Sequence, residues 1–200
     1  MSNHYYSEKP TVESDRKKWS FMLKGHNFTF QSDRGVFSKN EVDFGSRLLI
    51  DSFTLSEVDG DILDVGCGYG PIGLSVAKHY DRHVDMIDIN ERAIELAKDN
   101  ATLNSIENVE IFQSNLFEKI NEGRKYAAIL TNPPIRAGKV VVHSIFKESF
   151  THLVDHGELW IVIQKKQGAP STIELLEKLF SEVEVVVKKK GYYIIKAKKS

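Results

Sequence analysis

Short apolar runs alternate with longer amphipathic segments from Ile62 to the end of the chain. A continuous apolar run of a few residues is typical of a strand buried on both faces, whereas apolar residues three or four positions apart are typical of a helix. The pattern predicts strands over 62–65, 84–89, 109–113, 127–132, 158–164, 183–187 and 192–197. It predicts helices over 70–79, 91–103, 140–154 and 172–180.

Strands and helices that alternate along a chain form a parallel sheet covered by helices. The last two predicted strands are joined by only a few residues around Gly191, which is too short for a crossover, so they must pair as an antiparallel hairpin. We therefore expect an α/β, Rossmann-like fold. Its core should be a doubly wound, seven-stranded mixed sheet with an antiparallel strand near one end.

The first part of the chain follows a different pattern. Two short runs, 19–23 and 28–31, flank a glycine-containing loop and predict a β-hairpin. A helix should follow over 44–53, where apolar residues recur at helical spacing, and either Ser38 or Asp43 could be its N-cap.

The composition is that of an ordinary globular domain. The 200 residues are 41% hydrophobic and 28% charged, which is enough for one main domain with one core. We expect residues 1–40 to form a hairpin extension packed on a main domain of residues 41–200. No apolar run approaches the roughly 20 residues of a membrane span, and the polar N-terminal residues lack the pattern of a signal sequence. These features predict a cytoplasmic protein that does not bind membranes.

A glycine-rich turn follows the first strand of the main domain, where residues 61–73 read DILDVGCGYGPIG. Glycines allow the positive φ of a tight turn and let a ligand approach the backbone, and the following helix directs its positive dipole end at that ligand. The spacing Gly66-x-Gly68-x-Gly70 is that of S-adenosylmethionine (SAM) methyltransferases. The spacing Gly68-x-Gly70-x-x-Gly73 also satisfies the dinucleotide fingerprint, so an NAD-dependent dehydrogenase stays a rival.

Two features favour SAM over a dinucleotide: Asp64, and the segment Asn132-Pro133-Pro134, which a dehydrogenase has no use for. Asp64, just before the turn, can accept hydrogen bonds from the cationic amino group of SAM, whereas its charge would repel a pyrophosphate. Asp88 ends the second strand about twenty residues beyond the turn, where a carboxylate can bind both ribose hydroxyls, unless it caps the following helix. Asn115 follows the third strand and can face the adenine amine, or cap a helix. The predicted cofactor-binding residues are Asp64, Gly66, Cys67, Gly68, Gly70, Asp88, Ile89, Asn115, Leu116 and Asn132.

The fourth strand ends in Asn132-Pro133-Pro134, beside the expected position of the sulfonium methyl group. The prolines fix φ and remove backbone donors, so the Asn132 side-chain oxygen and the Pro133 carbonyl become paired acceptors. Such a pair can hold the two hydrogens of a planar NH2 group and concentrate electron density on its nitrogen. We therefore predict that Asn132, Pro133 and Pro134 form a catalytic unit that works by positioning and electrostatics, without a general base.

The chain resembles the class I methyltransferases related to the 16S ribosomal RNA guanine-N2 methyltransferases, nearly from end to end. The resemblance is carried by residues 35–38, 42–46, the glycine loop and 132–139, which read GVFS, VDFGS and NPPIRAGK outside the loop. It implies the class I strand order 3-2-1-4-5-7-6, SAM as the cofactor and structured RNA as the substrate. In the characterised enzymes an aromatic residue and then a histidine usually follow the prolines, where this chain has Ile135 and Arg136. Those enzymes also usually have an additional N-terminal domain.

Basic and apolar residues around the target site are candidates for RNA binding. Because Ile135 offers no aromatic face, Phe37 could stack on the target base, although it could equally belong to the core. Basic clusters that follow the fifth strand and precede the last hairpin turn should lie on one edge with Arg136, whereas Lys198 and Lys199 should form a solvated tail. The predicted substrate-binding residues are Phe37, Ile135, Arg136, Lys139, Lys165 and Lys166.

The leading hypothesis is a SAM-dependent methyltransferase that modifies guanine N2 in 16S rRNA. Methylation of adenine N6 or of a protein glutamine amide stays open, because enzymes for both use Asn-Pro-Pro. A non-catalytic RNA-binding module that keeps the fold is a further alternative. No metal is expected, since His152 and His156 are four residues apart but have no evident third ligand.

Overall fold

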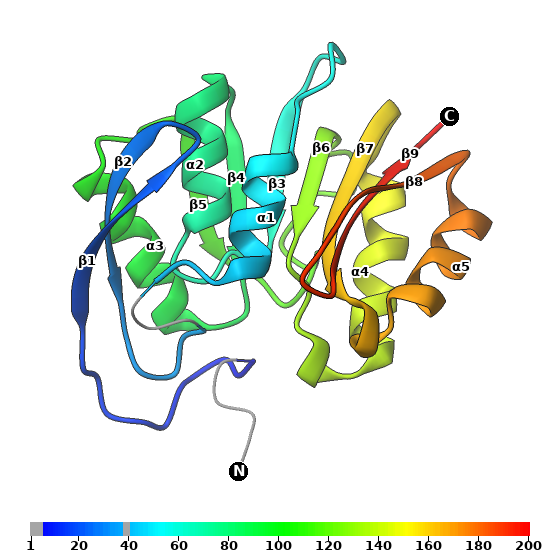
Figure 1. Cartoon of the computed structure of the whole chain (residues 1–200). Coiled ribbons are helices and arrows are strands. Elements are labelled where there is room, and N and C mark those ends of the chain that lie inside the picture. Colours follow the sequence, from blue (N-terminus) through cyan, green and yellow to red (C-terminus); the bar gives the residue numbers. More distant parts are fainter. Residues whose placement is uncertain (1–5, 38–40) are drawn as a thin grey trace.

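The computed structural model describes residues 6–37 and 41–200. Its centre is a seven-stranded sheet in the order β5-β4-β3-β6-β7-β9-β8 (Figure 1). Neighbouring strands from β5 to β7 are parallel, and β9 is antiparallel to both β7 and β8. The strands are β3 (Asp61–Val65), β4 (Val84–Asp88), β5 (Val109–Gln113), β6 (Tyr126–Thr131), β7 (Leu153–Gln164), β8 (Glu182–Lys189) and β9 (Tyr192–Lys198). This order confirms the predicted 3-2-1-4-5-7-6 arrangement.

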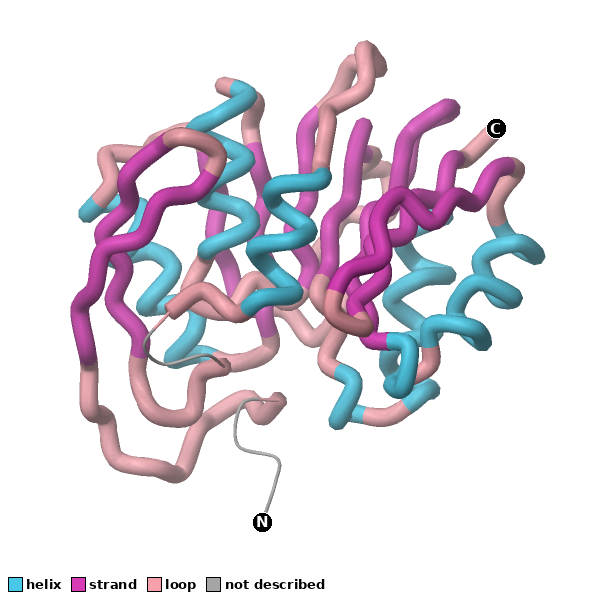
Figure 2. Tube along the Cα trace, in the orientation of Figure 1, coloured by secondary structure: helices cyan, strands magenta, loops and turns pink. Residues whose placement is uncertain are grey.

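Helices cover both faces of the sheet (Figure 2). One apolar cluster contains Ile62 and residues of three helices, while Leu63, the next residue on β3, belongs to a second cluster with the other two helices. Successive strand residues point to opposite faces, so both faces of the central strands are buried. The first face carries α1 (Phe44–Ser52), α2 (Pro71–Tyr80) and α3 (Glu91–Leu103), and the second carries α4 (Lys139–His152) and α5 (Ala169–Leu179).

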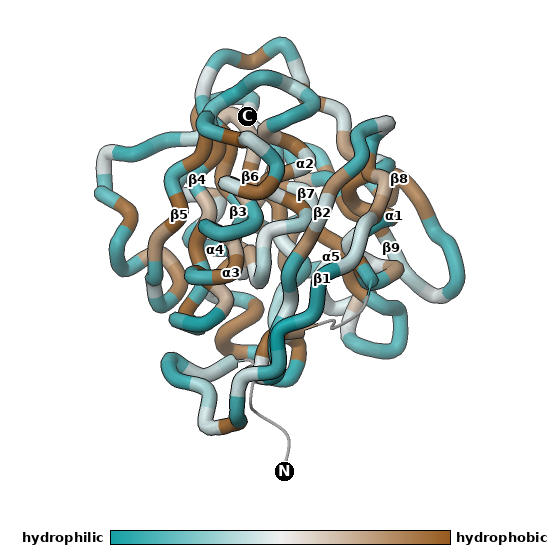
Figure 3. The backbone as a smooth tube through the Cα atoms, turned by 90° about the vertical axis from the view of Figure 1, so that its left-hand side faces the viewer, coloured by the Kyte–Doolittle hydropathy of each residue, from teal (hydrophilic) through white to brown (hydrophobic). Residues whose placement is uncertain are grey.

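The predicted hairpin forms from β1 (Lys17–Leu23) and β2 (His26–Ser32) and lies against α3, on the side shown in Figure 3. Phe28 and Phe30 are fully buried in the same apolar cluster as α3. The free edge of β2 is paired with two helix side chains, because the amides of Asn100 and Asn104 each bind a backbone N–H and C=O of β2 at 2.7–2.9 Å. Two asparagines one helical turn apart therefore act as a partner strand for β2.

Several predicted boundaries need correction. Asp43 caps α1, since its Oδ2 accepts a hydrogen bond from Ser46 N at 3.0 Å, and Ser38 lies outside the described residues. Helix α4 ends at His152, earlier than expected, and β7 begins at the next residue, with a register shift before regular pairing resumes at Glu158. Helix α5 begins three residues early, at Ala169, because Gly168 takes a left-handed conformation and a proline occupies the first turn.

Within the described residues, every helix is too short or too polar to span a bilayer.

Candidate functional site

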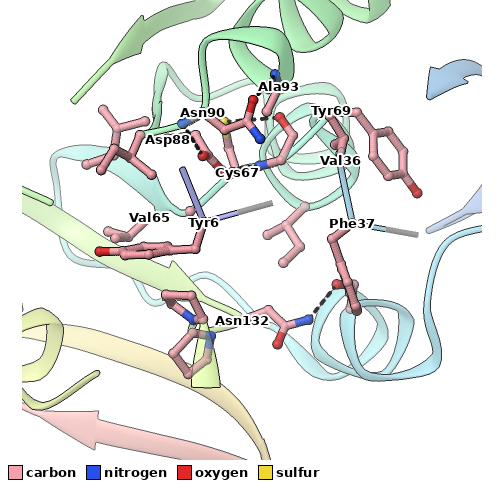
Figure 4. A pocket seen from close by; sticks show the side chains of 18 of the residues that line it. Tyr6, Val36, Phe37, Val65, Cys67, Tyr69, Asp88, Asn90, Ala93 and Asn132 are labelled. Carbon is pink, nitrogen blue, oxygen red and sulfur yellow. Dashed lines mark hydrogen bonds between the residues drawn. The ribbon is translucent and has the colours of Figure 1, made fainter. Parts of the chain in front are cut away.

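A cavity opens at the carboxyl ends of β3, β4 and β6, where ligands bind in doubly wound sheets (Figure 4). It gathers side chains from the N-terminal segment, α1, the glycine loop and the ends of three strands. The predicted site residues that line it are Phe37, Gly66, Cys67, Gly68, Asp88, Ile89, Leu116, Asn132, Pro133 and Pro134. Those that do not are Asp64, Gly70, Asn115, Ile135, Arg136, Lys139, Lys165 and Lys166.

The glycines of the loop have two different roles. Gly66 and Gly68 have φ of 74° and 56°, and a Cβ atom added to either would meet open space, so their backbone is exposed to a ligand. Gly70 and Gly73 serve packing instead. A Cβ on Gly73 would lie 2.7 Å from the Met86 side chain, which shows how closely α2 approaches the sheet.

Asp88 lies at the end of β4 and holds the glycine loop in place. Its Oδ2 accepts a hydrogen bond from Gly68 N at 2.9 Å, and its Oδ1 accepts one from Asn90 N at 2.8 Å. Burial raises the pKa of Asp88 to about 6, although these hydrogen bonds act in the opposite direction. The alternative role, capping α3, belongs to Asn90, whose side chain accepts from Ala93 N.

Asp64 is fully buried behind the loop and does not reach the cavity. Its Oδ2 accepts a hydrogen bond from Gly73 N at 2.9 Å, while its Oδ1 has no partner among the described residues. Burial, reinforced by the charge of Asp88, raises the pKa of the Asp64 carboxyl to about 7. In this structure Asp64 therefore supports the start of α2, and its contact with a cofactor amino group stays a prediction.

Asn115 is directed away from the cavity. Its side chain is exposed, and its Nδ2 donates to Glu118 Oε1 at 3.0 Å. The neighbouring residues Ser114 and Leu116 line the cavity in its place. Any contact with a bound base at this position would therefore be largely apolar, through Leu116.

Asn132 is held in one orientation by α1. Its Nδ2 donates to Ser46 Oγ at 3.0 Å and to Asp43 Oδ2 at 3.3 Å (Figure 4). Because both amide hydrogens face α1, the side-chain oxygen is left for a ligand. Asp43 thus caps α1 and positions Asn132 at once.

Asp43, Ser46 and Tyr6 line the cavity but were not predicted as site residues. Asp43 and Ser46 belong to the segment VDFGS, which is one of the segments that carry the family resemblance. That resemblance was the signal that could have identified them as site residues. Tyr6 carries no local sequence signal.

Of the predicted substrate-binding residues, Phe37 lines the cavity, with 49% of its surface exposed, and the others do not line it. Ile135 packs against the apolar cluster that contains α4 and α5. Arg136 and Lys139 are exposed around the start of α4. Lys165 N donates to Gly191 O at 2.9 Å, which places the end of β7 beside the β8–β9 turn.

Lys199 and His152 both pair with backbone carbonyls. Lys199 is not simply a solvated tail, because its Nζ donates to Phe150 O at 3.1 Å and to Leu153 O at 3.0 Å and so caps the end of α4. His152 is buried, its Nδ1 lies 2.9 Å from Arg124 O, and its ring stacks on Phe117. The pairing of His152 is therefore that of a core residue.

The chain is similar to several known proteins. The uncharacterized protein YbxB of Bacillus subtilis (strain 168) is 68% identical over 200 residues and is covered completely, as is this chain. Ribosomal RNA small subunit methyltransferase C of Vibrio cholerae serotype O1 is 32% identical over 194 residues, which are 94% of this chain and 54% of the relative. The chain thus spans about half the length of that relative.

A solved structure shares the same fold. The Thermus thermophilus 16S rRNA N2 G1207 methyltransferase, in complex with AdoMet and guanosine, superposes with a TM-score of 0.84 at 23% identity and covers 96% of this chain and 52% of its own. The family model of the methyltransferase small domain matches residues 27–196, which include the glycine loop, the Asn-Pro-Pro segment and all of the seven-stranded sheet except the last two residues of β9. The chain belongs to the methyltransferase small domain family.

Proposed function

We propose that this protein transfers a methyl group from SAM to an exocyclic amine of structured RNA, with guanine N2 in 16S rRNA as the acceptor. The observation that carries the proposal is the fixed orientation of Asn132. Its amide hydrogens are bound by Ser46 and Asp43, so its oxygen is left for a ligand, and we propose that it acts together with the Pro133 carbonyl. Two acceptors side by side match the two hydrogens of an NH2 group.

The other end of the cavity fits SAM. The open backbone at Gly66 and Gly68 lies at the start of α2, whose dipole favours the carboxylate of the methionine moiety. Asp88 lines the cavity as an acceptor for ribose hydroxyls, and Leu116 offers an apolar contact for adenine. The AdoMet and guanosine bound to the Thermus thermophilus enzyme, and the name of the Vibrio cholerae relative, support this cofactor and acceptor.

The chemistry would be a direct displacement. The amine nitrogen attacks the methyl carbon, the carbon–sulfur bond breaks, and its electron pair remains on sulfur, which becomes a neutral thioether. The methylated nitrogen carries the positive charge and loses a proton to water. Asn132 and Pro133 would hold the nitrogen in line with the methyl carbon and stabilise the charge that develops on its hydrogens.

A basic surface at the carboxyl edge of the sheet would bind the RNA backbone. The link between Lys165 N and Gly191 O brings the end of β7 next to the β8–β9 turn. Positive side chains at this edge of the sheet would neutralise phosphates. We name this surface the basic rim, and it comprises Arg136, Lys139, Lys165, Lys166, Lys188, Lys189 and Lys190.

The test offers tritiated SAM and the purified protein to 16S rRNA, small ribosomal subunits, tRNA and total protein from a strain that lacks the gene. Label on a guanine N2 in 16S rRNA is the expected result. Label on adenine N6, or label only in protein, would refute guanine N2 as the acceptor. Binding of NAD instead of SAM in calorimetry would refute SAM as the cofactor.

The Asn132→Ala variant tests the acceptor role directly. We expect it to lose methyl transfer by about a hundredfold or more, comparable with the loss of a preorganised catalytic hydrogen-bonding group. SAM binding should change little in the same variant. Full activity of Asn132→Ala would refute the proposed grip on the amine.

A further inference from the structure

The N-terminal segment of residues 6–15, named here the N-terminal clip, runs past the carboxyl edge of the sheet before it enters β1 (Figure 1). Hydrogen bonds fasten it at two places. The carbonyl of Glu8 accepts a bond from Glu91 N at 3.0 Å, at the start of α3. Ser14 Oγ donates to Asp33 Oδ2 at 2.6 Å, and Asp15 N donates to the other oxygen of Asp33.

Close packing holds the middle of the clip. Gly35 has φ of 81°, and a Cβ atom there would lie 2.9 Å from Pro10 Cβ and 3.0 Å from Val12 Cγ2. The carbonyl of Gly35 also accepts a hydrogen bond from Asn90 Nδ2 at 2.9 Å. The clip is thus packed onto the strand-to-loop segment whose next two residues line the cavity, so its position is tied to the cavity wall.

Tyr6 is the clip residue that lines the cavity. In Figure 4 its ring points into the cavity on the side of Val65, with Asp88 and Asn132 around the same space. Burial, and then the negative charge of Asp88, raise the pKa of the Tyr6 hydroxyl, so the phenol remains neutral at physiological pH. A neutral aromatic ring over a cavity with Asp88 in its wall suits a nucleoside, because its face contacts a flat, uncharged surface.

We propose that Tyr6 is a cofactor-binding residue and that the N-terminal clip closes the cofactor site by placing the Tyr6 ring over the bound nucleoside. The inference rests on SAM as the proposed cofactor but not on the identity of the acceptor. A ring that covers the ligand must move before the ligand leaves, so the clip should act mainly on the rate of dissociation.

The experiment measures SAM binding by calorimetry and SAM dissociation by stopped-flow for four proteins. Tyr6→Ala should raise the Kd about tenfold, the effect of losing one aromatic–base contact, mostly through faster dissociation. Tyr6→Phe keeps the ring and should stay within about twofold of the wild type, since the ring and not the hydroxyl makes the proposed contact. Glu8→Ala is the matched control, because Glu8 takes part through its backbone carbonyl, and its SAM binding should be unchanged.

The unfolding temperature of each unliganded variant reports whether the fold is intact, and Tyr6→Leu supplies a second ring-free variant if Tyr6→Ala is unstable. A folded, ring-free variant that binds and releases SAM like the wild type would overturn the proposal. Tighter binding by that variant would also overturn it, because the ring would then occupy the site rather than cover the ligand. A wild-type protein that fails to bind SAM would instead refute the proposed function.

Discussion

Asp64 should make the stability of this protein fall as pH rises, and Asp64→Asn should remove that loss. The carboxyl group is fully buried, receives a hydrogen bond only from Gly73 among the described residues, and has its pKa raised from 3.8 to about 7. Between these two values the folded state keeps a proton that the unfolded chain has released. The contribution of Asp64 to stability is therefore greatest below pH 4 and declines until the folded-state pKa is passed.

The magnitude follows from the pKa. Each pH unit between the two pKa values costs roughly 1.4 kcal/mol, so the wild-type loss assigned to Asp64 between pH 5 and pH 8 is roughly 3 kcal/mol. Asparagine keeps an oxygen for Gly73 N and carries no charge at any pH. It also buries an NH2 group where the free Oδ1 was, at a cost of about 1–3 kcal/mol, but this cost does not depend on pH and cancels in the comparison.

Urea unfolding followed by tryptophan fluorescence at pH 5 and pH 8 measures the effect. The free energy of unfolding of Asp64→Asn, relative to the wild type, should rise by roughly 3 kcal/mol from pH 5 to pH 8. Asp59→Asn, at an exposed carboxylate, is the control and should stay within about 0.5 kcal/mol of the wild type at both pH values. A difference between Asp64→Asn and the wild type that is the same at both pH values would refute the reasoning.

Two other predictions concern hydrogen bonds between distant segments. Ser46→Ala removes the shorter of the two hydrogen bonds that orient Asn132, at a residue that is only 4% exposed. Methyl transfer, measured by single-turnover labelling, should therefore fall about tenfold, while the SAM affinity measured by calorimetry should be retained. Equal turnover in Ser46→Ala and wild type would show that Asp43 alone orients the amide. Asn104→Ala leaves the N–H and C=O of Thr29 without their partner and should lower the free energy of unfolding, measured by urea unfolding, by roughly 2 kcal/mol. A loss under about 0.5 kcal/mol would mean that water replaces the hydrogen bonds of the Asn104 side chain.

Local signals in the sequence were enough for the framework of the fold. Apolar runs, helical spacing and the short connection at Gly191 determine which segments are strands, which are helices and why the last pair is antiparallel. These are properties of neighbouring residues, so a reading of the chain can find them. The ends of the elements are predicted less well. Helix α4 ends where β7 begins to pair with β6, and this early pairing includes a register shift that depends on the partner strand.

The site divides in the same way. The sequence alone located the glycine turn, Asp88 at the end of its strand and the Asn132-Pro133 segment at the end of β6, since each is a short motif with its own backbone requirement. Only the tertiary structure decided that Asn132 is oriented from α1 across 86–89 positions of chain and that Tyr6 reaches the cavity. Such contacts depend on how the packing of helices against the sheet brings together segments that are far apart in the sequence. A local pattern of residue types does not predict which distant segments will meet.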